Sequence, residues 1–139
     1  MKFARPSTHP PNQRAFTLVE IMIVVAIIAM LAAMAVPGLL RARKRAQAGT
    51  VRVDLRLIDD AVEQYGAENG LQKGANVTVT AWRAYLKPGT RLYVNNTTIF
   101  GDSYGDQQVG SLPKVPATVW DMTTDVCDAN FWAPYVRSQ

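Results

Sequence analysis

Residues 16–36 read FTLVEIMIVVAIIAMLAAMAV, and these twenty-one residues carry a single charge, on Glu20. At about 1.5 Å per residue, a helix of this length spans about 30 Å, which matches the hydrocarbon core of a bilayer. The stretch therefore predicts either a helix that crosses a membrane or a signal sequence that is removed.

Two interpretations of this apolar stretch need no special motif. A secretory signal peptide would have a basic region ending at Arg14 and a small-residue site, Ala33-Met34-Ala35, with cleavage before Val36. An ordinary single-pass anchor would leave the chain uncut and would give Glu20 no role. Against the signal peptide, a charge at the centre of a membrane helix costs about 2.5 to 3.5 kcal/mol, so Glu20 weakens an apolar region that does not need it.

A third interpretation rests on the motif Arg14-Ala15-Phe16-Thr17-Leu18-Val19-Glu20. Its order of basic, small, Phe, Thr, Leu, aliphatic and Glu resembles the prepilin peptidase site of type IV pilins and type II secretion pseudopilins. The resemblance implies cleavage between Ala15 and Phe16, N-methylation of Phe16 and a role of Glu20 in assembly. The chain departs from the family at Ala15, where the family usually has Gly, and Ala is the smallest substitute.

The charge of Glu20 supports a functional role on physical grounds, because an ionisable side chain in a membrane segment is costly and needs a partner. We expect that partner to be an amine. In a stack of parallel helices, the free ammonium group of Phe16 in one subunit can neutralise Glu20 of a neighbour and fix the axial register. A glutamate at the membrane interface without a role is the alternative.

The pair Pro37-Gly38 follows the apolar stretch and is expected to interrupt the helix, because Pro removes a backbone hydrogen bond and Gly adds backbone freedom. Pilin-like proteins often carry a proline here, which implies a hinge at Pro37 and Gly38. A simple helix end at the membrane surface is the alternative.

From residue 50 onward the spacing of apolar residues predicts that the helix resumes with a narrow apolar stripe. The stripe consists of Val51, Leu55, Ile58, Val62 and Tyr65. Asn69-Gly70 predicts a left-handed end of the helix, closed by Leu71. The whole helix is expected over about residues 16–69, or roughly 80 Å at the usual rise.

Charge is distributed unevenly along the chain, whose formal net charge is +4. Residues 41–56 hold six Lys or Arg against one Asp, whereas residues 57–139 hold six against nine acidic residues. The cluster at residues 41–45 (Arg-Ala-Arg-Lys-Arg) is either a solvated helix face or a site for anionic lipid headgroups or DNA. By charge count, the positive-inside rule mildly favours placing this cluster in the cytoplasm. The family resemblance implies the opposite orientation, which we prefer because the two flanks differ by one charge.

The chain offers little for the commonest hydrolytic chemistries. Its one histidine, His9, lies in the expected leader, so a processed chain would have no Ser-His or Cys-His pair. Its one cysteine, Cys127, has no partner for an internal disulfide or for a Cys-based zinc site. We therefore expect no catalytic residues and no enzyme activity.

Residues 71–139 are rich in turn-forming residues and predict a small head. We expect a helix over residues 81–87 capped by Thr80, and short strands over residues 91–94 and 97–100 around an Asn95-Asn96 turn. Residues 112–116 should be extended. Four aromatic residues are expected to anchor the C-terminal segment: Trp120, Phe131, Trp132 and Tyr135.

Acidic loops in the head suggest calcium as the one candidate cofactor, because carboxylate oxygens are hard ligands. The candidate ligands are Asp102, Asp106, Asp125 and Asp128, with Asp121 nearby. Resemblance to major pseudopilins, which often hold calcium in a late loop, points the same way. Aspartates that only form turns or cap helices are the alternative.

The predicted fold is α+β, with a long N-terminal helix packed on a small head that contains short antiparallel strands. Its expected parts are a cleaved leader at 1–15, a transmembrane and assembly half at 16–36, an amphipathic half at 37–70 and a globular head at 71–139. The resemblance implies a structural filament subunit of a bacterium, most simply a type II secretion pseudopilin in a periplasmic pseudopilus. A type IV pilus subunit is the alternative, and a membrane-anchored or secreted binding module is the alternative of another class.

The same resemblance implies the partners and the location. The partners are copies of the chain in a helical filament, related minor pilins or pseudopilins, the prepilin peptidase, an inner-membrane assembly platform and membrane lipid, whereas DNA is not indicated. The chain would first cross the inner membrane with its N-terminus in the cytoplasm and its head in the periplasm. It would then enter a periplasmic or extracellular filament.

Overall fold

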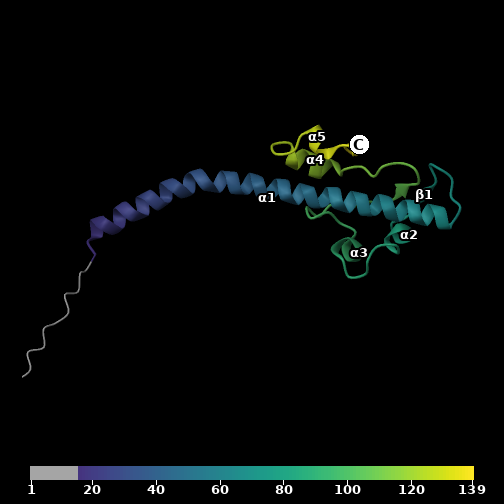
Figure 1. Ribbon diagram of the computed structural model, residues 1–139, viewed down its shortest axis with the longest axis horizontal. Coiled ribbons are helices and arrows are strands. Elements are labelled where there is room, and N and C mark those ends of the chain that lie inside the picture. Colours follow the sequence, from purple (N-terminus) through teal and green to yellow (C-terminus); the bar gives the residue numbers. More distant parts are fainter. Residues whose placement is uncertain (1–15) are drawn as a thin grey trace, which may run out of the picture. The chain divides into compact units, whose positions relative to one another are not determined.

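The computed structural model describes residues 16–139, and its longest element is helix α1, Leu18–Glu68, of 51 residues (Figure 1). The helix assignment continues without a break through Pro37, Gly38 and Gly49, so the interruption expected at Pro37-Gly38 is wrong. A proline removes only one hydrogen bond, and in a helix this long the turns on both sides hold the conformation. The chain nevertheless divides at this place into two compact units, Met1–Pro37 and Gly38–Gln139. A hinge there stays a prediction.

The described part of the first unit is an apolar helical surface. Among residues 16–139, α1 is the one helix long and apolar enough to cross a membrane. Its most apolar window has a mean hydropathy of 2.8, and none of that window is buried within the chain. Lipid or another protein would have to cover this surface.

In the second unit, the apolar stripe of α1 forms the centre of the core. Val51, Leu55 and Ile58 are fully buried, Val62 is nearly so, and Tyr65 is partly buried against the same core. The predicted stripe is therefore confirmed, and it shows that the head packs on this half of the helix.

The end of α1 also follows the prediction. Gly70 adopts a left-handed φ of 61°, and the Leu71 N–H donates to the Gly66 carbonyl at 2.9 Å. The Gly70 N–H donates to the Ala67 carbonyl at 3.4 Å, which completes a Schellman motif. This reversal sends the chain back along the helix.

The only sheet among the described residues has two short antiparallel strands, β1 (Asn76–Val77) and β2 (Gln107–Gln108). Asn76 pairs with Gln108, and Val77 pairs with Gln107. The α+β class is thus confirmed, but these strands lie outside the predicted positions. Strands of two residues carry no alternating pattern that a sequence could reveal.

Two predictions in the first part of the head are wrong. Helix α2 is Val79–Arg83, one turn that begins after Thr78 and not after Thr80. Residues 91–94 are not a strand, because helix α3 covers Arg91–Asn95. The Thr90 side chain caps α3 by accepting from the Tyr93 N–H at 3.3 Å. Residues 97–100 contribute only an isolated bridge between Thr97 and Ser103.

The C-terminal segment has helices α4 (Ala117–Thr123) and α5 (Ala129–Trp132). In Figure 1, α2 and α3 lie on one side of α1, and α4 and α5 lie on the other. The extended run before α4 is confirmed by a parallel bridge between Val115 and Arg137. The aromatic anchors are confirmed too: Trp132 and Tyr135 are buried, and Trp120 and Phe131 are partly buried and contact Trp132.

Candidate functional site

The first turn of α1 holds Glu20 in a reciprocal pair of hydrogen bonds. The Thr17 hydroxyl accepts from the Glu20 N–H at 3.2 Å, and the Glu20 carboxylate accepts from the Thr17 N–H at 3.3 Å. This is a capping box, in which a Thr at the helix start and a Glu three residues later satisfy each other's backbone donors. Phe16 precedes the helix and is exposed.

The capping box gives Glu20 a local role that the sequence analysis missed, although its Thr-x-x-Glu spacing was visible. The carboxylate accepts from a backbone N–H that has no partner within the helix, so the two groups satisfy each other at the start of α1. It is also placed at the positive end of the helix dipole, which favours a negative charge. Pairing with an amine of a second copy stays a prediction, and Ala15 lies outside the described residues.

Two residues of the basic cluster at residues 41–45, Lys44 and Arg45, contact the head. Lys44 Nζ forms a 2.9 Å ion pair with Asp125, and this pair lowers the pKa of that carboxyl group. The guanidinium of Arg45 lies 5.5 Å from the centre of the Phe131 ring, and that of Arg52 lies 5.2 Å from it on the same ring. Part of the cluster therefore holds the C-terminal segment on α1.

A second anchor, also missed from the sequence, lies at the middle of the same helix half. Asp54 is buried, forms an ion pair with Arg91, and accepts a 2.9 Å hydrogen bond from the Tyr104 hydroxyl. Arg91 also donates to the Thr97 carbonyl. Burial, followed by the nearby charge of Asp54, raises the pKa of the Tyr104 hydroxyl above its ordinary value. The network ties the loop after α3 to the long helix.

Three of the four calcium candidates bind other groups of the chain through their carboxylates. Asp125 pairs with Lys44, and Asp128 caps α5 by accepting from the Phe131 N–H at 2.9 Å. Asp106 accepts from the Val79 N–H at 2.9 Å. Asp102 and Asp106 both line a cavity of about 530 Å³.

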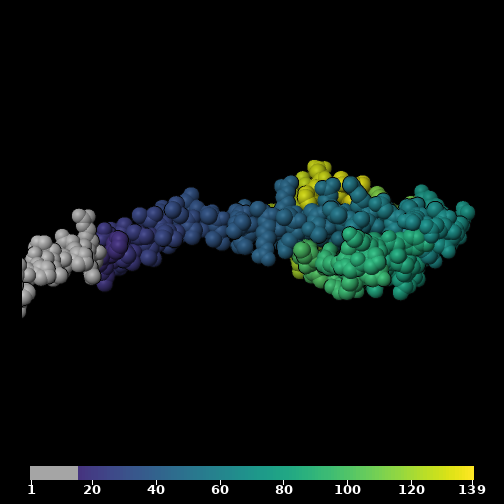
Figure 2. Space-filling model, turned by 60° about the horizontal axis from the view of Figure 1, so that its bottom comes forward, coloured from purple at the N-terminus to yellow at the C-terminus, as the bar shows by residue number. Residues whose placement is uncertain are grey.

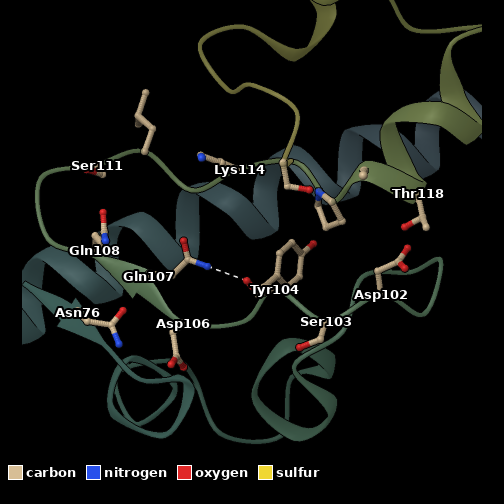
Figure 3. A pocket seen from close by; sticks show the side chains of 14 residues that line it. Asn76, Asp102, Ser103, Tyr104, Asp106, Gln107, Gln108, Ser111, Lys114 and Thr118 are labelled. Atoms are coloured by element: carbon tan, nitrogen blue, oxygen red, sulfur yellow. Dashed lines mark hydrogen bonds between the residues drawn. The ribbon is translucent and has the colours of Figure 1, made fainter. Parts of the chain in front are cut away.

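Figure 3 shows the Asp102 and Asp106 carboxylates apart from each other, on either side of Tyr104. Within residues 16–139, no three His, Cys, Asp or Glu side chains lie close enough together to hold a metal ion. Calcium binding therefore stays a prediction that no geometry of the described residues supports.

Cys127 is buried and free, and burial raises the pKa of its thiol.

Known proteins share the N-terminal features described above. Residues 10–36 match the family described as the prokaryotic N-terminal methylation motif. The match includes the end of the expected leader, Phe16, and the first part of α1, where Glu20 lies.

Curated relatives include both pilins and a secretion protein. The chain is 38% identical over 64 residues to the type IV major pilin protein PilA of Myxococcus xanthus, covering 46% of this chain and 29% of that protein. It is 49% identical over 61 residues to the type IV wide pilus major component PilA4 of Thermus thermophilus, covering 42% and 44%. It is 34% identical over 86 residues to the type II secretion system core protein G of Klebsiella pneumoniae, covering 59% and 60%.

These alignments span less than two thirds of each relative, so the chain is similar to part of each of these proteins. No solved structure is significantly similar to the chain.

Proposed function

We propose that this chain is the structural subunit of a type IV pilus-like filament, and specifically a pseudopilin of a type II secretion system. In this proposal the prepilin peptidase cuts between Ala15 and Phe16, the new N-terminus is methylated, and the chain waits in the inner membrane with its head in the periplasm. Copies then assemble, with their N-terminal helices bundled inside the fibre.

The observation that carries the proposal is the uncovered apolar half of α1. Sixteen large apolar side chains between residues 16 and 40 are at least half exposed. Since each is worth about 1.5 to 3 kcal/mol when buried, leaving them in water would cost tens of kcal/mol. That exceeds the whole stability of an ordinary domain, about 5 to 15 kcal/mol. Lipid before assembly and neighbouring helices after it provide the cover.

The choice of a pseudopilin rests on the extent of the similarity. The alignment with core protein G of Klebsiella pneumoniae covers 86 residues, whereas those with the two pilins cover 64 and 61. The 49% identity to the wide pilus component of Thermus thermophilus favours a type IV pilus subunit as the second candidate. Deleting the gene in its own bacterium separates them: a pseudopilin mutant loses secreted enzymes from the medium, and a pilin mutant loses surface pili.

Processing is tested by the intact mass and N-terminal sequence of the protein purified from membranes. We expect a chain that begins at Phe16 and is heavier by one methyl group. A chain that begins at Val36, or one that still begins at Met1, contradicts the proposal.

The role of Glu20 is tested by three variants that separate its charge from its hydrogen bonds. Glu20→Gln keeps the capping box, because Gln can fill the same position, but it removes the charge. We expect Glu20→Gln and Glu20→Ala to be processed and to stay in the membrane without entering filaments. Thr17→Ala keeps the charge and weakens the helix start by about 1 kcal/mol, and it should still assemble. Normal filaments from Glu20→Gln would show that the charge is dispensable.

A further inference from the structure

The head contains a polar cavity of about 530 Å³ that is formed mainly by two parts of the chain. One part is β1 together with residues 102–108, and the other is residues 111–118, which lead into α4. Figure 2 shows the α2–α3 part of the head and the C-terminal segment on either side of an exposed strip of α1, and residues 102–118 connect the two along the chain. The volume lies in the range of about 300 to 1,000 Å³ that is typical of small-molecule sites.

The two strands place a pair of amide side chains at the cavity. Asn76 of β1 pairs with Gln108 of β2, and both line the cavity. Residues paired in this way project from the same face of a sheet, with their Cβ atoms about 4.5 to 5.5 Å apart. Each amide carries two donors and an acceptor, and both residues are exposed. The exposed hydroxyls of Ser111 and Thr118 each donate and accept as well, so the lining is rich in uncharged hydrogen-bonding groups.

Three charged side chains line the cavity, namely Asp102, Asp106 and Lys114. None of them takes part in the three ion pairs formed within residues 16–139. Two carboxylates against one ammonium group disfavour an anionic ligand, because like charges repel. A metal ion is disfavoured as well, since the two carboxylates lie apart on either side of Tyr104 and no third metal-binding side chain among the described residues joins them (Figure 3). The lining therefore favours a neutral ligand.

Hydrogen bonds within the chain hold the cavity lining in place. The Gln107 amide nitrogen donates to the Tyr104 carbonyl at 2.8 Å (Figure 3) and to the Gly105 carbonyl at 3.3 Å. Asp106 is fixed by the Val79 N–H, which donates to its carboxylate at 2.9 Å. Because these contacts are formed within the head itself, a ligand would meet a lining that is already ordered, and binding would cost less conformational entropy.

We propose that this cavity binds a neutral oligosaccharide. The hydroxyl groups on neighbouring carbons of a sugar ring each donate and accept, and the paired amides of Asn76 and Gln108 present donors and acceptors side by side. The carboxylate of Asp102 accepts from a further hydroxyl, in a hydrogen bond stronger than one between neutral groups. Leu112, which is 48% exposed, contacts the C–H face of a ring. The inference goes beyond the proposed function, because every lining residue lies in the head and none in the membrane half of α1.

An extended peptide is the main alternative, because it could add a strand to the open edge of β2. The Gln108 carbonyl at this edge already accepts from the Ser111 N–H at 3.2 Å. The strand is also only two residues long, Gln107–Gln108, so few backbone groups remain for a ladder with a peptide. Side-chain amides and hydroxyls are the more numerous partners in this lining, and they favour a saccharide.

The test is calorimetric titration of the chain, purified from membranes in micelles of a detergent without a sugar headgroup, with EDTA present. The probes are three neutral tetrasaccharides: maltotetraose, cellotetraose and N-acetylchitotetraose. We expect at least one of them to bind with a Kd below about 1 mM. Asn76→Ala combined with Gln108→Ala should weaken that binding about tenfold, because two hydrogen-bonding amides are lost. Gln72→Ala removes an exposed amide outside the cavity lining and should leave the binding unchanged.

Gln108→Met is a second variant, which keeps the length of the side chain but loses the amide. It should weaken binding about threefold and leave the near-ultraviolet circular dichroism spectrum of the head unchanged. Equal binding by the unmodified chain and by both variants would place the sugar elsewhere on the chain and refute the inference.

Three other results would overturn the inference. The first is that none of the three tetrasaccharides binds at millimolar concentration. The second is binding only when calcium replaces EDTA, because a cation and not the side chains would then recognise the sugar. The third is binding of a blocked tetra-alanine peptide but of none of the saccharides, which would assign the cavity to a peptide. Since these titrations do not depend on filaments, such results would leave the proposed function standing.

Discussion

Replacing Asp54 by Ala tests whether a single buried carboxylate holds the middle of the head on α1. The side chain of Asp54 is 8% exposed, and that of its partner Arg91 is 32% exposed. Breaking a fully buried ion pair costs about 3 to 5 kcal/mol, but water reaches Arg91 and lowers that cost. The Tyr104 hydroxyl loses a hydrogen bond to a charged acceptor, worth about 1.5 to 3 kcal/mol. We therefore expect Asp54→Ala to lower the free energy of unfolding by about 3 kcal/mol.

The assay is guanidinium unfolding of the processed chain in detergent micelles, followed by tryptophan fluorescence. All three tryptophans, Trp82, Trp120 and Trp132, lie in the head, so the signal does not report on the membrane half of α1. Asp54→Asn is the matched control, since it keeps a hydrogen-bond acceptor of the same size and should cost about 1 kcal/mol. A loss below about 0.5 kcal/mol for Asp54→Ala would refute the reasoning, because such values are typical of surface substitutions.

Two further predictions concern packing and pH. In Gly66→Ala the new Cβ would stand 2.9 Å from a methyl carbon of Val109, so a clash of about 1 to 3 kcal/mol should outweigh the gain of about 1 kcal/mol in helix propensity. The same unfolding assay should show a net loss for Gly66→Ala, and that loss should be smaller when Gly66→Ala is introduced into a Val109→Ala background. The pKa of Tyr104 is raised in the folded head above its ordinary value of 10.0, so its contribution to stability is complete below pH 10 and declines above it, where the unfolded chain ionises first. Tyr104→Phe should make the alkaline decline in unfolding free energy shallower, and an unchanged slope would contradict this.

The sequence predicted the long helix well, because its signals are local and repeated. The apolar stripe and the Asn69-Gly70 end depend on spacing and on backbone preference, and neither requires knowledge of the rest of the chain. The predicted strand at residues 91–94 was wrong because the structure there depends on contacts with residues elsewhere in the chain. Its β-branched and aromatic residues favour a strand, but the Thr90 cap and the Arg91 contact with Asp54 favour a short helix.

At the candidate site, the residues with a motif could be predicted, whereas those that depend on tertiary contacts could not. The Thr17 and Glu20 capping box follows from their spacing, and attention to the membrane charge alone overlooked it. Asp54 lies three residues after Val51 on the apolar face, and a polar residue there indicates a buried anchor. That its partners are Arg91 and Tyr104 could not be inferred, because they lie far along the chain in loops without periodic patterns.

The central row of Val51, Leu55, Ile58 and Val62 has a mechanical consequence. The long helix itself provides the middle of the core. A force applied along the helix axis would therefore shear all the close-packed contacts between this row and the head at the same time. The Asp54 network and the Lys44 pair with Asp125 join the head to the same helix by polar contacts. Pulling on the helix should therefore move the head as a single body, and the head needs no flexible tether to follow it.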